Sequence, residues 1–115
     1  MLEKIKALIA SVCTAYIGSL PTTPDNAVSI TPYGGGTRDL VGSEYREPYF
    51  QIRVRNTSYP TGYALCESIA DLLHGVHNTS DFLLIAQVGD IQGMGRDNNN
   101  RNEWTVNFRA YVKGA

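Results

Sequence analysis

The C-terminal part of the chain carries the pattern that most limits its fold. Residues 104–112 alternate between two sets of side chains, and the polar residues 95–103 precede them. Successive side chains of a β-strand point to opposite faces, so this alternation predicts a strand with one face in the core. The inward set is Trp104, Val106, Phe108, Ala110 and Val112, and the outward set is Thr105, Asn107, Arg109 and Tyr111. A sheet that is covered on one face only is therefore expected.

Three further strands are predicted earlier in the chain. Residues 27–31 form a short strand that Pro32 closes, and residues 82–88 are a nearly continuous apolar run. Such a run is typical of a strand in the sheet interior, where both faces are covered. Residues 49–55 repeat the C-terminal alternation. Their inward set is Phe50, Ile52 and Val54, and their outward set is Gln51, Arg53 and Arg55.

Two amphipathic helices are predicted from apolar residues spaced three and four apart. The first begins at Leu2 and ends near Gly18, because Pro21 and Pro24 prevent its continuation. The second follows the capping residues 56–58 and ends near Gly75.

Together these elements predict a single α+β domain over residues 1–115. Its order is α-β-β-α-β-β, and it is a two-layer α/β fold with two helices packed on one face of a mixed four-stranded sheet. A right-handed crossover is expected across residues 49–88. Two long irregular connections, residues 33–47 and 89–102, remain, and loops of this length are often functional.

Candidate chemistry is sparse. His74 and His77 lack further ligands at metal-binding spacing, so we interpret them as residues at a helix C-terminus. Cys13 and Cys66 lie on core-facing helix stripes and are expected to be reduced thiols. Two pairs of carboxylates, Glu44 with Glu47 and Asp90 with Asp97, are interpreted as solvated loop residues and not as acid/base pairs. Two glycine-rich stretches, residues 34–36 and 89–95, are interpreted as connections and not as phosphate-binding loops. No enzyme activity, metal or cofactor is therefore expected.

The net charge of −1 supplies no field that would attract nucleic acid or an anionic membrane. Neither a membrane span nor a signal peptide is expected at the N-terminus, because charged residues interrupt its apolar stretch. The outward arginines Arg53, Arg55 and Arg109 share a face with Tyr111. Two interpretations of this face stay open: a solvated surface with cross-strand ion pairs, or a contact surface for another subunit or a ligand.

Four stretches of the sequence resemble tailed-bacteriophage proteins labelled minor capsid protein, a family related to the tail terminators. They are Tyr16-Ile17-Gly18-Ser19-Leu20-Pro21, Pro24-Asp25-Asn26-Ala27-Val28, Pro48-Tyr49-Phe50-Gln51-Ile52-Arg53-Val54-Arg55, and Gly95-Arg96-Asp97 through Arg101 to Asn107-Phe108-Arg109. Their order and spacing span nearly the whole chain.

The resemblance implies a structural virion protein of the tail or neck, made in the cytoplasm of the bacterial host. Its subunits would form a homo-oligomeric ring, a hexamer, that caps the tail tube and joins it to the head-tail connector protein. Its partners would be itself, the tail tube protein and the connector, with DNA at most passing through the lumen. The two long connections would reach neighbouring rings, and Arg53, Arg55 and Arg109 would serve subunit contacts or face the DNA channel. The residues expected at contacts are Arg53, Arg55, Arg109, Tyr111, Arg96, Asp97 and Arg101.

Three other functions are alternatives to a tail terminator. A head-tail connector, or neck, protein would need ring formation and contact loops of the same kind. A small ligand-binding domain or enzyme would need a concave pocket with convergent polar groups. A nucleic-acid module would use the arginine face, but most aromatic residues lie on the apolar side.

Overall fold

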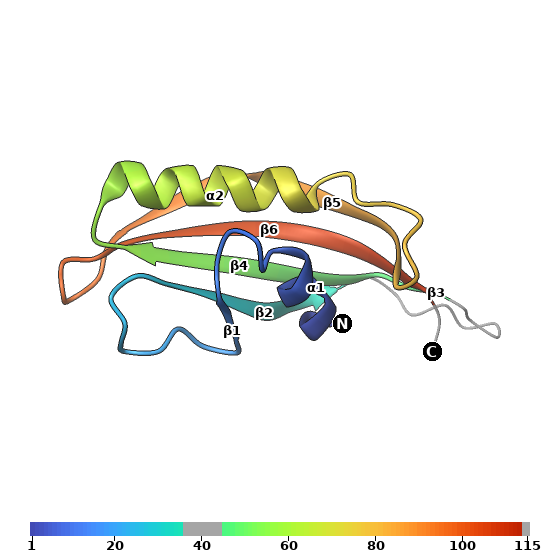
Figure 1. Ribbon diagram of the computed structural model, residues 1–115, viewed down its shortest axis with the longest axis horizontal. Helices are drawn as coiled ribbons and strands as arrows, with labels where there is room; N and C mark the ends of the chain where they lie inside the picture. The colour runs from blue at the N-terminus through green and yellow to red at the C-terminus, as the bar shows by residue number, and fades with distance from the viewer. Residues whose placement is uncertain (36–44, 114–115) are drawn as a thin grey trace.

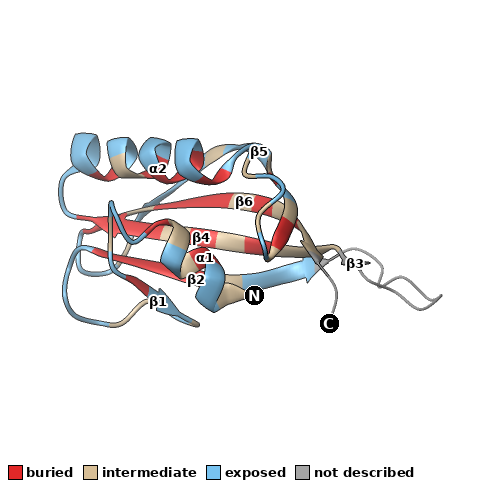
Figure 2. Ribbon diagram, turned by 45° about the vertical axis from the view of Figure 1, so that its right-hand side comes forward, coloured by how far each residue is buried: buried red, intermediate tan, exposed pale blue. Residues whose placement is uncertain are grey.

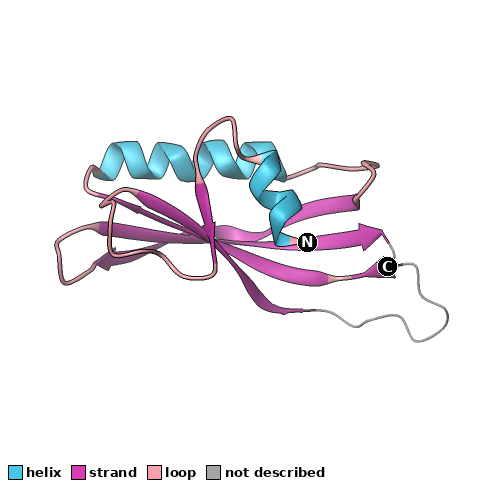
Figure 3. Ribbon diagram, turned by 60° about the horizontal axis from the view of Figure 1, so that its bottom comes forward, coloured by secondary structure: helices cyan, strands magenta, loops and turns pink. Residues whose placement is uncertain are grey.

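The computed structural model describes residues 1–35 and 45–113. Figure 1 shows an elongated molecule, measuring 48 × 23 × 23 Å, in which helix α2 (Tyr59–Leu73) runs along the sheet. Helix α1 (Leu2–Leu8) lies on the same side of the sheet (Figure 3), and Ile5 packs into the same core as Ile69 and Leu73 of α2. The predicted two-layer α+β class is confirmed.

The described residues form one mixed sheet of six strands: β1 (Ala15–Ile17), β2 (Ala27–Gly35), β3 (Tyr45–Arg46), β4 (Pro48–Asn56), β5 (Phe82–Arg96) and β6 (Asn102–Lys113). β1 pairs parallel with β2, while the pairs β2–β4, β4–β6 and β5–β6 are antiparallel. β3 also pairs with β6 and continues the line of β4, so the sheet is five strands wide. The predicted width of four strands is wrong, and the observed order is α-β-β-β-β-α-β-β.

The core forms where β4 and β6 lie side by side beneath α2. The register sets Phe50 opposite Phe108 and Ile52 opposite Val106, as the two alternating patterns predicted. The two phenylalanine rings stack with centroids 5.1 Å apart, and all four side chains are fully buried. Figure 2 shows the buried residues concentrated along these two strands. One face of β4 and β6 therefore holds the centre of the core.

Helix α2 lies close to the sheet because it carries a glycine at the contact. Ser58 caps the helix by accepting the backbone N–H of Thr61. Gly62 then faces Trp104, and a Cβ atom at this position would overlap the indole ring and come within 2.8 Å of Asn56 Cβ. The absence of a side chain at Gly62 thus sets the distance between helix and sheet.

The first helix is much shorter than predicted. It ends at Leu8, and residues 15–17 form the edge strand β1 instead of a last helical turn. Ala15 and Ile17 pair with Val28 and Ile30 of β2. Three apolar residues in a row are compatible with both helical and strand periodicity. The pairing with β2 therefore decided the local structure.

The predicted connection of residues 89–102 is also mostly strand. β5 extends to Arg96, and only residues 97–101 form the turn before β6. Gly89 and Gly95 adopt positive φ angles at two register shifts, which absorb residues that break the alternation. The glycine-rich, polar composition therefore marks bulges in a long hairpin. The other predicted connection lies in part outside the described residues, at 36–44, and its flanks belong to β2 and β3.

β5 does not lie in the sheet interior, as its apolar run had suggested. It pairs with β6 on one side, and the chain that follows α2 covers part of its other edge. Ile85 donates its N–H to Val76 and accepts the N–H of Gly75, and Asn78 donates to Leu83. This cover satisfies backbone groups that would otherwise be open for pairing with another chain.

Candidate functional site

The sheet face that the helices leave uncovered, called here the open face, is lined by polar side chains. Thr31, Gln51 and Asn107 lie in one row across β2, β4 and β6, and Gln51 donates to Asn107 at 3.0 Å. The neighbouring row contains Ser29, Arg53 and Thr105. The alternation of β4 and β6 thus places polar side chains opposite the core, although Ser29 and Thr105 are themselves buried.

Arg53 and Arg109 on this face each have a carboxylate beside them. Arg53 Nε lies 3.7 Å from Glu103 Oε1, and Arg109 Nε lies 3.6 Å from Glu47 Oε1. The Arg109 guanidinium also stands 5.3 Å from the ring centre of Tyr111, a cation–π distance. The open face therefore holds ion pairs, as expected for a solvated surface, and each of these two arginine charges has a carboxylate beside it.

Neither ion pair satisfies the arginine nitrogen that faces it. Both Nε atoms are buried, and no acceptor among the described residues lies within hydrogen-bond distance of them. At 3.6–3.7 Å the carboxylates supply charge compensation without hydrogen bonds. The two Nε atoms are therefore left without a hydrogen-bond partner in the described part of the chain.

Arg55 has the opposite environment, although it follows Arg53 by two residues on the same strand face. Its side chain is covered by residues 21–26, and only 4% of the residue is exposed. Arg55 Nε donates to the carbonyl of Asp25 at 2.9 Å, and Nη2 donates to those of Pro21 and Pro24 at 2.6 and 2.7 Å. The guanidinium thereby holds a segment whose carbonyl groups have no helix or strand to pair with.

Arg101 fixes the same segment from the turn of the β5–β6 hairpin. Its Nη1 donates to the Thr22 carbonyl at 2.7 Å and lies 3.4 Å from Asp25 Oδ1, while its Nε donates to Asp97 Oδ2 at 2.8 Å. Arg55 and Arg101, together with residues 21–26, are called here the arginine clamp. The clamp joins two segments far apart in sequence at one end of the molecule (Figure 1).

Asp97 organises the turn itself. Its carboxylate accepts the backbone N–H groups of Arg101 and Asn99, at 2.9 and 3.0 Å. These hydrogen bonds favour the charged form of Asp97 and hold its pKa below its ordinary value, and the bond from the Arg101 N–H has the largest effect. Arg96 is exposed beside the turn and donates to Asn100 at 2.9 Å. The turn is therefore a defined shape and not a loose connection.

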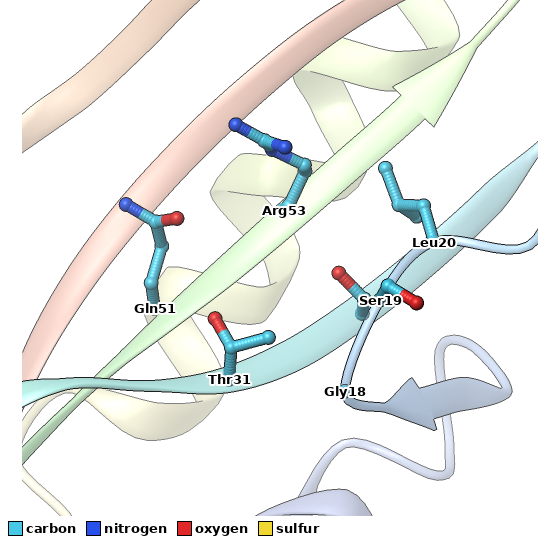
Figure 4. A pocket seen from close by; sticks show the side chains of 7 residues that line it. Gly18, Ser19, Leu20, Thr31, Gln51 and Arg53 are labelled. Carbon is cyan, nitrogen blue, oxygen red and sulfur yellow. The ribbon is translucent and has the colours of Figure 1, made fainter.

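A hollow of about 290 Å³ opens on the open face next to Arg53. Residues 18–20 form one wall, and the others come from β2 and β4, namely Ser29, Thr31, Gln51 and Arg53. Figure 4 shows Thr31, Gln51 and Arg53 rising from the sheet on the side away from α2. The walls thus present hydroxyl groups, the Arg53 guanidinium and the apolar side chain of Leu20, whereas the Gln51 Nε2 group already donates to Asn107.

The histidines and cysteines have structural roles. His74 Nδ1 accepts the backbone N–H of Gln87 at 3.0 Å, so this side chain continues the cover over the edge of β5. Cys13 and Cys66 are free thiols, and burial raises the pKa of Cys66 to about 12. Among the described residues, no group of three or more histidine, cysteine or carboxylate side chains could hold a metal ion. No helix in the same part of the chain is long and apolar enough to cross a membrane.

Sequence reasoning overlooked an acidic surface on the helix side of the molecule. Glu67 and Asp71 of α2 and Asp90 of β5 are exposed, and none makes an ion pair within the described residues. The charge of Glu67 is the largest cause that raises the pKa of Tyr63, followed by desolvation and the charge of Asp90, so Glu67 and Asp90 both lie near Tyr63. Asp71 follows Glu67 by about one turn of the helix. The signal was available, since α2 contains two acidic residues and no basic one.

The chain is similar to known proteins in sequence family and in fold. Residues 3–113 match the model of a protein family described as bacteriophage tail terminator protein. A chain from the solved virion of a native gene transfer agent particle has a similar fold, with a TM-score of 0.67 and 18% sequence identity. The similarity covers 96% of this chain and 84% of that chain. No curated protein sequence matches the chain.

Proposed function

Since the chain belongs to the bacteriophage tail terminator protein family, we propose that it is the subunit of a ring that completes the phage tail. The ring caps the finished tail tube and joins it to the head-tail connector. The family match over residues 3–113 carries this proposal, because it extends from the first helix to the end of the last strand.

The two sides of the subunit support assembly into a ring. The open face is polar and carries arginines, while the opposite side carries α2 with the acidic surface. A closed ring needs heterologous contacts, in which one surface of a subunit meets a different surface of its neighbour. A subunit with two unlike sides meets that requirement, and six copies would give the hexamer.

The expected contact residues divide into two groups under this proposal. Arg53, Arg109 and Tyr111 are partly exposed on the open face and contact a neighbour directly. Arg55 and Arg101 are buried, so their contribution to contacts is indirect, through the segment that they hold. Arg96 precedes the hairpin turn and Asp97 begins it, and this turn reaches the tail tube protein or the connector protein.

DNA passes through the lumen of the proposed ring without a dedicated binding face. Glu103 and Glu47 balance the charges of Arg53 and Arg109, so the open face lacks the excess positive charge of a phosphate-binding surface. Contacts between protein subunits suit such a face better, because paired charges set register and partner choice.

Electron microscopy of the purified protein, with and without isolated tail tubes, tests the proposal. We expect rings about as wide as the tail, located at tube ends. The measurement with tubes is required because some subunits are monomeric alone and oligomerise once they bind their partner. Binding to the connector with no binding to tubes would favour the neck-protein alternative, and a monomer that ignores both would contradict the proposal.

A further inference from the structure

The hollow on the open face has the size and chemistry of a site for an acidic side chain. Its volume of about 290 Å³ exceeds that of one carboxylate-bearing side chain, and the hollow is open to solvent on one side. The Ser19 and Thr31 hydroxyls, the Arg53 guanidinium and the side chain of Leu20 line it, and Gln51 also lines it with its Nε2 group already donating to Asn107. Arginine is suited to such a site because its planar fork matches the two oxygens of a carboxylate.

Arg53 has donors available for that carboxylate. Glu103 lies 3.7 Å from Nε, too far for a hydrogen bond, and 42% of the arginine side chain is exposed. Nε itself is buried, so a carboxylate from outside could meet only the exposed remainder of the guanidinium group. A second carboxylate approaching from outside would meet a guanidinium whose charge is partly balanced but whose hydrogen bonds are incomplete.

We propose that this hollow receives a carboxylate from the acidic surface of a second copy of the chain, formed by Glu67, Asp71 and Asp90. The inference rests on the proposed ring and names the contact that builds it. These three side chains are exposed and without ion pairs among the described residues. In the part of the chain that the structure describes, their carboxylates lack a basic partner, and Arg53 is the one basic side chain that lines the hollow, so this pair of groups selects a second copy as the occupant.

The fold prevents one subunit from making this contact with itself. The hollow lies on the open face, and α2 covers the opposite face of the same sheet, as Figure 4 shows with the helix behind the strands. The acidic surface and the hollow are thus separated by the sheet. Each subunit offers one hollow and one acidic surface, which is the arrangement that gives a heterologous, head-to-tail contact.

Charge reversal on each side of the contact tests the proposal. Arg53→Glu should raise the concentration needed for half-maximal ring formation by roughly tenfold to a hundredfold, because like charges would then meet. The variant E67R/D71R/D90R should do the same. Lys6→Glu, a single reversal on α1, is the matched control and should assemble as the unmodified protein does. Sedimentation velocity measures assembly in solution, and the fraction of capped tube ends measures it on tail tubes.

Mixing the two defective variants gives the sharpest result. In a ring where they alternate, each hollow altered by Arg53→Glu would face an arginine-bearing surface, and each hollow that keeps Arg53 would face an unmodified acidic surface. We therefore expect an equimolar mixture to recover assembly to within about threefold of the unmodified protein. Failure of the mixture, when each variant is folded by circular dichroism, would overturn the proposal.

A cross-linking measurement keeps the proposal testable if a charge variant does not fold. A photoreactive amino acid in place of Ser19 at the wall of the hollow should cross-link to α2 or to the segment around Asp90 of a neighbour. A cross-link to any other surface would reject this contact while leaving the ring intact. Absence of rings from the unmodified protein, alone and on tubes, would instead reject both the ring and the contact.

Discussion

Arg53 and Arg55 project from the same face of one strand, two residues apart, yet they lie in different environments. Arg53 is partly exposed beside Glu103 at 3.7 Å, without a hydrogen bond from its Nε. Arg55 is 4% exposed, and its hydrogen bonds go to the carbonyl groups of Pro21, Pro24 and Asp25. The difference arises because residues 21–26 cover one arginine and leave the other uncovered. Position on a sheet face therefore does not decide what an arginine does.

The arginine clamp stabilises the subunit through buried hydrogen bonds, whereas the open-face arginines are the ones that we propose for contacts outside it. Breaking a buried, hydrogen-bonded charge leaves unpaired polar groups, which costs far more than breaking an exposed ion pair. The two classes should consequently separate in measurements of folding and of assembly.

Arg55→Ala should have the largest effect on folding. Its removal leaves three backbone carbonyls without their donor, and we expect the free energy of unfolding to fall by about 2–4 kcal/mol. Urea denaturation followed by circular dichroism measures the loss. Arg53→Ala is the matched control, and equal destabilisation by both substitutions would erase the distinction between the two environments.

Arg101→Ala should destabilise the subunit by about 1–3 kcal/mol, since it loses the contacts to Thr22 and Asp97. Because Arg55 and Arg101 hold the same segment, their effects should not add. The double substitution should cost less than the sum of the single ones by at least about 0.5 kcal/mol. Additive losses in a double-mutant cycle would mean that the clamp is not one unit.

Asp97 should make the turn sensitive to acid. Its pKa is lowered in the folded protein, so it contributes stability that is present above its unfolded pKa and is lost as pH falls through the folded pKa. Asp97→Asn should therefore lower the free energy of unfolding at neutral pH. The difference in free energy of unfolding between this variant and the unmodified protein should become smaller as the pH falls. Denaturation curves between about pH 2 and pH 7 cover this window. A constant difference across that range would contradict the assignment.

Arg53→Ala should have the smallest effect on folding, about 0–1 kcal/mol, because the ion pair with Glu103 is partly exposed and lacks a hydrogen bond. The same variant should weaken ring assembly by the largest factor among these substitutions. Loss of stability without loss of assembly would assign Arg53 to the fold instead of to a contact.

Sequence patterns predicted the elements that rest on long, regular spacing. Residues 49–55 and 104–112 form adjacent strands, with Phe50 and Phe108 in the core as their alternation indicated. The second helix was placed correctly because its apolar stripe and its Ser58 cap are local signals. The alternation also placed Arg53, Arg55 and Arg109 on the face opposite the helices.

Short or irregular segments escaped prediction because their structure depends on partners elsewhere in the chain. β1 forms since β2 supplies backbone partners for three residues whose sequence also fits a helix. The second half of β5 forms since β6 lies beside it, while glycine bulges hide the strand pattern. The expected contact set likewise mixed exposed arginines with the buried Arg55 and Arg101.

The sequence by itself determined the class of the fold, the two core strands and the polar character of the open face, since strand alternation and helical periodicity are properties of neighbouring residues. Only the tertiary structure decided the sheet width, the cover over Arg55 and the hollow beside Arg53. Each of these depends on the path of residues 15–26, which lie beside β2 and then over side chains of β4, and local patterns contain no information about that path.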